Sequence, residues 1–159
     1  MPHHHIDLLA RLEVNDHRLG YTTEVSANWS EIGKIYHAVM SRIRSEYPYV
    51  GDLTMLGGHS SHSYQTGANL YFVYDYQINC EPREEIEQYH IPLNAIIVQE
   101  ALRFGGSMVH HHGIGKYRTE WTAEEHGSAY PLLARMKTAL DPHGTMNPGT
   151  IFPTPPAGP

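Results

Sequence analysis

The sequence predicts an α+β fold, in which two helices pack on one face of an antiparallel sheet and a further helical segment follows at the C-terminal end. Two kinds of pattern support this prediction. Apolar residues alternate with polar ones in some stretches, as in strands, and recur every three or four positions in others, as in helices. The order along the chain is strand, helix, strand, strand, helix, strand, which is the ferredoxin-like arrangement.

The first strand and the first helix are predicted from the first third of the chain. Tyr21 to Ala27 alternates loosely and indicates a strand, after which Asn28 or Ser30 can cap a helix. Apolar residues then recur at helical spacing up to Glu46, and Pro48 ends the helix. These apolar residues are Ile32, Ile35, Tyr36, Val39, Met40 and Ile43. We interpret their stripe as core packing.

Two consecutive strands should come next, Val50 to His59 and Gly67 to Ile78. The second is rich in aromatic residues and alternates strongly. Because successive side chains of a strand point to opposite faces, we expect Tyr71 on one face of the sheet and Phe72 on the other.

A second helical stretch and a last short strand complete the predicted sheet layer. Pro82 to Phe104 has an apolar helical face, although Pro92 should kink this helix or split it in two. Gly106 to Val109 is predicted as a short strand. Pro131 to Leu140 adds the C-terminal helix.

The chain divides into three predicted parts. Residues 1–19 contain leucine and isoleucine at the spacing of a short amphipathic helix. Residues 20–152 form the folded domain. Residues 153–159 are a Pro-rich tail that we expect to be a mobile end.

Length, charge and composition limit the classes of protein. At 159 residues with 40% hydrophobic content, the chain is long enough for one domain with a core. Its 11 Lys and Arg against 17 Asp and Glu give a net charge of −6, which argues against nucleic acid or an anionic membrane as a general partner. No apolar run approaches the roughly 20 residues of a membrane span, and the pattern of a signal peptide is missing, so we expect a cytoplasmic protein. The single cysteine, Cys80, cannot form an internal disulfide, and we interpret it as a passive thiol.

Three consecutive histidines form the most informative stretch. His110, His111 and His112 lie between two glycine pairs in Gly105 to Gly115, GGSMVHHHGIG. Histidine titrates near neutral pH, and the glycines indicate a tight turn in which backbone and imidazoles approach another group closely. Because histidine makes up 13 of the 159 residues, the triplet could also be compositional. We interpret it as the floor of an active site.

The histidine motif resembles a signature of a large flavoprotein superfamily. GGSMVHHHGIGKYRTEW, residues 105–121, is similar to the C-terminal signature of the alkyldihydroxyacetonephosphate synthases, which share a superfamily with vanillyl-alcohol oxidase. TGANLYF at 66–72 is similar to a substrate-side strand of these synthases, and LDPHGTMNPG at 140–149 resembles the closing motif of the superfamily. Other branches carry a glutamate where this chain has His111. The resemblance covers roughly Glu24 to Phe152.

The resemblance implies that the chain is the C-terminal, substrate-side or cap portion of an FAD-dependent enzyme. In this family a flavin-binding domain precedes the cap, and the sequence carries no glycine-rich dinucleotide fingerprint. We therefore expect FAD to be bound mainly by another domain or subunit, and the lone chain to be inactive. The implied reaction is either the oxidation of an alcohol or 2-hydroxy acid, or the exchange of an acyl for an alkyl chain without net redox change.

Residue roles also follow from the resemblance. Tyr71 matches a tyrosine assigned to proton transfer, and the histidine triplet matches an essential set of histidines. Breaking a C–H bond beside a flavin needs a base with a pKa near neutral, which suits these residue types. Gly113 and Asn147 are the implied cofactor contacts. Lys116 and Arg118 could supply a positive field or hold an anionic head group of a small-molecule substrate, and the alternative is that they are solvated loop charges.

Metal binding is a second hypothesis. Some 2-hydroxyacid dehydrogenases of the superfamily bind a divalent metal through two histidines and a glutamate. His62 corresponds to the first ligand, but Tyr71 and His111 stand at the other two positions, so the resemblance does not imply a metal. Independently, His59, His62 and His111 could supply enough imidazoles for zinc or nickel.

A third hypothesis is a non-catalytic binding subunit. An exposed aromatic sheet face would then be buried in an oligomer. An oligomer is also what we expect if a separate subunit carries the flavin.

Overall fold

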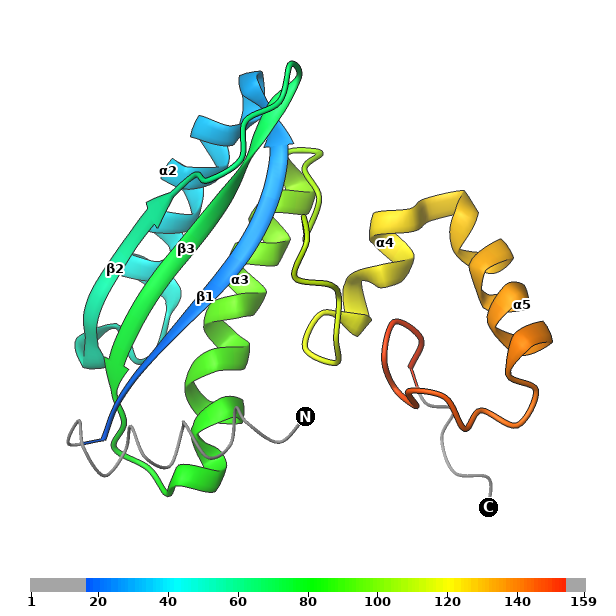
Figure 1. The fold of residues 1–159 in the computed structure, drawn as a ribbon. Helices are drawn as coiled ribbons and strands as arrows, with labels where there is room; N and C mark the ends of the chain where they lie inside the picture. The colour runs from blue at the N-terminus through cyan, green and yellow to red at the C-terminus, as the bar shows by residue number, and fades with distance from the viewer. Residues whose placement is uncertain (1–16, 154–159) are drawn as a thin grey trace.

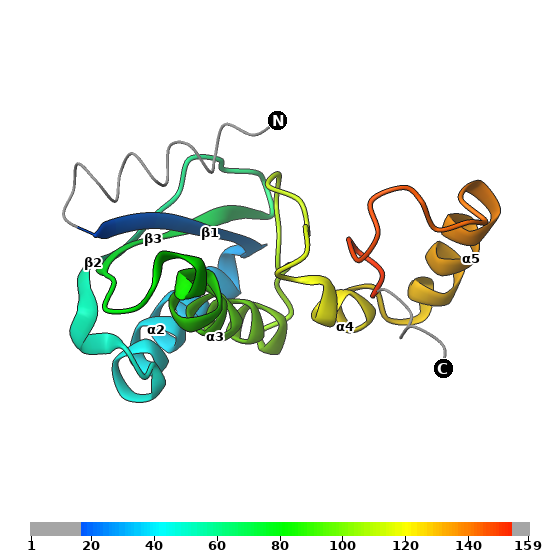
Figure 2. The ribbon, with the colours of Figure 1, turned by 90° about the horizontal axis from the view of Figure 1, so that it is seen from below.

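The computed structural model describes residues 17–153. Strands β1 (Arg18–Asn28), β2 (Leu53–His59) and β3 (Gly67–Gln77) form an antiparallel sheet in the order β1-β3-β2. Helices α2 (Trp29–Glu46) and α3 (Ile91–Arg103) cover the same face of this sheet (Figure 1, Figure 2). The predicted α+β fold with both helices on one face is confirmed. The other face, on the side opposite the helices, is called the open face below.

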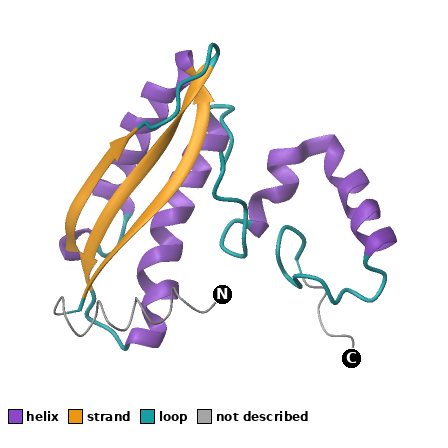
Figure 3. Cartoon of the chain, viewed as in Figure 1, coloured by secondary structure: helices purple, strands orange, loops and turns teal. Residues whose placement is uncertain are grey.

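Short helices occupy the connections and the C-terminal part. Turns of 3-10 helix lie at Val50–Asp52, Pro82–Glu84, Thr119–Trp121 and Gly127–Ala129, and a π-helical turn lies at Ile86–His90. Helices α4 (Thr122–His126) and α5 (Tyr130–Leu140) lie beyond the end of α3 and away from the sheet (Figure 3). Among residues 17–153, no helix has the length and apolarity that crossing a membrane requires.

Two predicted parts fall largely outside the described residues. The short helix predicted from Ile6, Leu8, Leu9 and Leu12 lies entirely outside them. Of residues 1–19 only 17–19 are described, and of the tail only Pro153. Strand β1 already begins at Arg18, two residues before the predicted start of the folded domain.

Most predicted boundaries hold within a few residues. Helix α2 follows Asn28, which makes no side-chain capping hydrogen bond, and the chain turns extended at Tyr47, directly before Pro48. Strand β2 begins three residues later than predicted because Val50–Asp52 forms a helical turn. Pro92 lies in the first turn of α3, and the π-helical turn Ile86–His90 leads into this helix without an extended residue between them, so the predicted helical stretch changes its winding next to Pro92.

The prediction of a fourth strand at Gly106 to Val109 was wrong. Only Ser107 pairs with β1, through two backbone hydrogen bonds with Ser26 of 3.0 and 2.7 Å. The backbone amide and carbonyl of Met108 bond to side chains instead. The Met108 amide donates to Glu125 over 2.9 Å, and the Met108 carbonyl accepts a bond of 2.6 Å from Arg118. The segment therefore lies beside β1, where a fourth strand would lie, but leaves it after one bridge.

The core lies between the sheet and helices α2 and α3. Strand β3 alternates as predicted, with Phe72, Tyr74 and Tyr76 fully buried and Tyr71 only partly buried. The buried phenols have polar partners. Tyr74 lies 2.9 Å from His90 Nδ1, and Tyr76 donates a short hydrogen bond to Glu85. The packed aromatic face of β3 therefore points to the helices and leaves its polar face open.

Candidate active site

A row of three side chains crosses the open face of the sheet. The strand register places Glu24 of β1 opposite Tyr71 of β3, and Tyr71 opposite His59 of β2. The rings of His59 and Tyr71 stack with centroids 4.8 Å apart. Because paired residues of neighbouring strands share a face, antiparallel pairing alone brings this acid, phenol and imidazole together.

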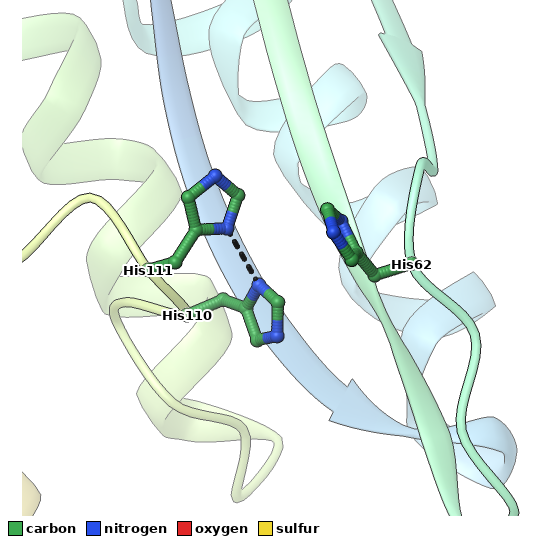
Figure 4. A group of neighbouring side chains, drawn as sticks. All are labelled: His62, His110 and His111. Atoms are coloured by element: carbon green, nitrogen blue, oxygen red, sulfur yellow. Dashed lines mark hydrogen bonds between the residues drawn. The ribbon is translucent and has the colours of Figure 1, made fainter.

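The loop that carries the three histidines, residues 104–118 after α3, lies along one edge of this row and is called the histidine loop below. Figure 4 shows His110 and His111 on the loop after α3, with His62 of the β2–β3 connection facing them. The His62 ring centroid lies 5.3 Å from each of the other two. The β2–β3 connection and the histidine loop therefore meet over the same part of the sheet.

A buried carboxylate lies beneath the imidazoles. Glu24 is fully buried, and its Oε1 lies 3.1 Å from the Nδ1 atoms of both His110 and His111. Its Oε2 accepts a 3.2 Å bond from the His111 backbone amide. Burial alone would raise the pKa of this carboxyl, but the hydrogen bonds it accepts, led by that from Asn69, lower the pKa below its ordinary value. Glu24 is therefore an ionised acceptor at the point where the two Nδ1 atoms meet.

Asn69 fixes the carboxylate and the loop that carries His62. Its Nδ2 donates to Glu24 Oε1 over 2.7 Å. Its Oδ1 accepts from the backbone amides of Ser61 and His62 over 3.1 and 2.9 Å. The buried Asn69 amide thus positions both the Glu24 carboxylate and the backbone that carries His62.

Two tyrosines reach the outer nitrogens of the imidazoles. Tyr71 Oη lies 2.9 Å from His111 Nε2, and Tyr64 Oη lies 2.7 Å from His110 Nε2. The two Nδ1 atoms of the imidazoles lie 2.8 Å apart. His112 is exposed, with its ring centroid 5.2 Å from that of Tyr71. The structure thus brings together all four residues predicted to be catalytic.

The predicted substrate-binding residues occupy different environments. Arg118 is buried, and its Nη1 donates to the backbone carbonyls of Glu24 and Met108 over 3.0 and 2.6 Å. Burial lowers the pKa of this guanidinium below its ordinary value. Lys116 is exposed on the loop. Arg118 therefore anchors the loop to β1, whereas Lys116 is free to face a ligand.

The two implied cofactor contacts lie apart from each other along the chain. Gly113 is exposed in the histidine loop with φ of 80°, a conformation that favours glycine. Asn147 lines a cavity of about 690 Å³ next to α5. The lining of this cavity includes Lys137 and Asp141, but it contains none of His62, His110, His111 and His112. Asn147 also has a positive φ, of 47°.

Two groups of side chains in the described residues have the spacing of metal ligands. They are His62, His110 and His111, and Glu24, His111 and His112, each with ligand atoms within 4.8 Å of one another. His59, named as a candidate ligand from the sequence, belongs to neither group and stacks on Tyr71 instead.

Sequence reasoning missed Glu24, Asn69 and Tyr64. One signal was available for Glu24, because it is the only charged residue in the predicted strand Tyr21 to Ala27. A carboxylate inside a strand that is otherwise uncharged indicates either a partner or a functional role.

Comparison with known proteins places the chain in a family. The model of the family "FAD linked oxidases, C-terminal domain" matches residues 6–151. The "uncharacterized FAD-linked oxidoreductase YgcU" of Escherichia coli O157:H7 is 62% identical over 136 residues, which are 85% of this chain and 28% of that protein. Alkyldihydroxyacetonephosphate synthase of Trypanosoma brucei brucei is 28% identical over 130 residues, 81% of this chain and 20% of that protein.

Similar coverage is found among solved structures. A structure of alkyldihydroxyacetonephosphate synthase aligns with a TM-score of 0.49 and 16% identity, covering 79% of this chain and 19% of that chain. The chain thus spans 28% or less of the length of these relatives. By the family match and the YgcU identity, the chain belongs to the C-terminal domain family of the FAD-linked oxidases.

Proposed function

We propose that this chain forms the substrate-side wall of an FAD-dependent active site, in which Tyr71 and the histidine triplet hold and move a proton. FAD is the cofactor of the family, and it supplies a site for two electrons when it is bound. The observation that carries the proposal is the 2.9 Å contact between Tyr71 Oη and His111 Nε2 on the open face. A phenol bonded to an imidazole that is held by a carboxylate is suited to proton transfer.

The open face fits one part of a flavin cofactor. Exposed imidazoles at His59 and His112 and the partly exposed phenol of Tyr71 offer polar partners to the nitrogen and oxygen atoms of a flat ring. The cavity beside His110 measures about 260 Å³. Since pockets for whole ligands typically measure roughly 300 to 1,000 Å³, we propose that most of FAD is held by a flavin-binding domain or subunit. Gly113 and Asn147 remain the proposed contacts of this chain with the cofactor.

The proposed chemistry at Tyr71 begins with a proton on its hydroxyl. His111 Nε2 accepts that proton, and the buried Glu24 carboxylate offsets the positive charge that develops on the imidazole. The phenolate then takes a proton from the substrate. Lys116, exposed on the same loop, is the proposed contact for an anionic head group, while Arg118 adds positive potential from below.

Two reaction classes fit this arrangement. The name of the E. coli relative describes an oxidoreductase, which favours oxidation of an alcohol or 2-hydroxy acid. The synthase relatives favour exchange of an acyl for an alkyl chain on a phosphate-bearing substrate. Both classes need a proton to be removed beside the flavin, so both give Tyr71 and His111 the same role. An oligomeric assembly and a cytoplasmic location remain part of the proposal.

Reconstitution with flavin tests the proposal. The visible spectrum and native mass of the purified chain, alone and with its flavin-binding domain or subunit, report whether FAD is bound. The flavin-loaded enzyme is then mixed with alcohols, 2-hydroxy acids and acyl glycerone phosphates, and flavin reduction and product formation are followed.

Single substitutions identify the proton-transfer groups. We expect Tyr71→Phe and His111→Ala each to slow turnover by about 10²- to 10⁴-fold, with FAD retained. His37→Ala, which removes an exposed imidazole from α2, is the matched control and should leave turnover unchanged. Near-normal turnover in both Tyr71→Phe and His111→Ala would contradict the proposed role.

The metal alternative makes a different prediction. If His62, His110 and His111 held a divalent cation, His62→Ala would abolish its binding, and a chelator would remove activity. A chelator that leaves turnover unchanged favours the proton-transfer role.

A further inference from the structure

We propose that Tyr71, His111, His110 and Tyr64 form a proton relay from the reacting face to solvent, and that Glu24 is the positioning residue that orients its two imidazoles. This inference rests on the proposed role of Tyr71. It adds Tyr64 as the outer end of the path and assigns a role to the buried carboxylate.

The four side chains form an unbroken series of hydrogen-bond contacts. Tyr71 Oη lies 2.9 Å from His111 Nε2, the two Nδ1 atoms lie 2.8 Å apart, and His110 Nε2 lies 2.7 Å from Tyr64 Oη. Each imidazole therefore has one nitrogen toward its tyrosine and the other toward the second imidazole. An imidazole can accept a proton at one nitrogen and release one from the other, so this geometry permits transfer along the whole series.

The ends of the series lie in different surroundings. Tyr71 is partly buried on the open face, where the substrate is proposed to lie. Tyr64 is 52% exposed, on the connection between β2 and β3. A proton that leaves the substrate side therefore has a path to water that does not cross the substrate.

Glu24 holds the two Nδ1 atoms around a single shared proton. Its Oε1 lies 3.1 Å from the Nδ1 atoms of both imidazoles, so it holds both rings with these atoms facing each other. The proposed role of Tyr71 as the donor to His111 Nε2 assigns this proton to His111 Nδ1, and the carboxylate and His110 Nδ1 both accept from it. His110 then carries its proton on Nε2, facing Tyr64.

The transfer balances in atoms and charge. The Tyr71 O–H bond breaks as a proton bonds to His111 Nε2. The Nδ1 proton of His111 passes to His110 Nδ1, and the Nε2 proton of His110 passes to Tyr64, which releases its own proton to water. Both imidazoles end neutral with their tautomers exchanged, Glu24 is unchanged, and Tyr71 is left as a phenolate.

The proton positions can be measured on the chain itself. We expect nitrogen-15 NMR of the imidazoles to show His111 protonated at Nδ1 and His110 at Nε2. In Glu24→Gln, which keeps the size of the side chain but removes its charge, we expect this single tautomer pair to be replaced by a mixture. A proton on Nε2 of His111 in the unsubstituted chain, or unchanged tautomers in Glu24→Gln, would overturn the inference without reference to any activity.

Kinetics of the flavin-loaded enzyme test the exit. We expect Tyr64→Phe to lower turnover at least about tenfold and added imidazole buffer to restore it, because a small base in solution replaces the missing hydroxyl. Rescue by a buffer distinguishes a relay from a loss of local structure. Tyr36→Phe, which removes a phenol hydroxyl from α2, is the matched control.

The two proposals fail in different ways. If Tyr71→Phe retains full turnover, the proposed function itself is wrong. If Tyr71→Phe and His111→Ala are inactive but Tyr64→Phe turns over normally, the proton leaves by another path and the relay is wrong.

Discussion

Lowering the pH from 7 to 5 should destabilise this domain through one buried imidazole, His90. The His90 side chain is 7% exposed, and its Nδ1 lies 2.9 Å from the Tyr74 hydroxyl in the core. Burial, aided by the positive charge of Arg118, lowers the pKa of His90 to about 4. An unfolded chain has a histidine pKa near 6.5, so it binds a proton in this pH range that the folded chain does not bind.

The expected size of the effect follows from these two values. A folded pKa below the unfolded one gives stability that is fully present above the unfolded value and is lost as the pH falls towards the folded value. One unit of pKa difference corresponds to about 1.4 kcal/mol, so the loss amounts to about 2 kcal/mol by pH 5 and about 3 kcal/mol below pH 4. Carboxyls with a lowered pKa, such as Glu24 and Glu100, lose their contribution only below about pH 4.5, outside this interval.

The assay is urea denaturation at pH 7 and pH 5 of the chain and of His90→Gln, which keeps a polar partner for Tyr74 but does not titrate. Burial raises the pKa of Glu85, and uptake of a proton by Glu85 would stabilise the folded state on acidification. This opposing effect is present in both proteins and cancels in the comparison. The chain should lose about 2 kcal/mol more than His90→Gln. Equal losses in the two proteins would refute the reasoning.

Three further predictions concern stability. Gly67→Ala should destabilise the fold by about 1 to 3 kcal/mol in urea titrations, because the new Cβ would overlap a backbone carbonyl of β1. Gly33→Ala in α2 is the control, since its Cβ meets open space and should stabilise the fold by roughly 0.5 to 1 kcal/mol. The opposite order of stabilities would contradict the close approach of β1 to Gly67. Asn69→Leu should cost about 1 to 3 kcal/mol, since it leaves Glu24 and two loop amides without their partner, and a neutral result would remove Asn69 from the organisation of the site. Arg118→Met should lower the free energy of unfolding by a similar amount, because it leaves two backbone carbonyls unpaired. Lys116→Met, at an exposed position, should change this free energy by less than about 0.5 kcal/mol. Equal effects of the two substitutions would argue against the anchoring role of Arg118.

Much of the fold could be predicted because its signals are local. Alternation in β3 and the three-to-four spacing in α2 depend on residues close in sequence, and both elements form as expected. The absence of a fourth strand could not be predicted, because it depends on side chains outside the segment. Arg118 and Glu125 take the backbone groups of Met108 that a strand would have paired.

The candidate site was only partly predictable for the same reason. The resemblance to a family identified Tyr71 and the histidine triplet, which lie together. Glu24 is 87 residues from His111 in sequence, and no periodicity relates the two positions. Their contact depends on where the loop after α3 crosses β1, which is a property of the tertiary structure. Charge and position could at most mark Glu24 as a strand residue that needs a partner.

Strand register links the core to the site. Phe72, Tyr74 and Tyr76 fill the helix-facing side of β3, and each buried aromatic contributes roughly 1.5 to 3 kcal/mol. A slip of one residue would expose all three and turn Tyr71 into the core, at a cost that no polar contact of the open face could offset. The apolar face therefore fixes the register, and the register places Glu24 and His59 on either side of Tyr71. The position of the Tyr71 phenol is thus determined by core residues on the opposite face of β3. Core substitutions that loosen β3 should therefore disturb the contacts of Tyr71 with His111 and His112 before they unfold the domain.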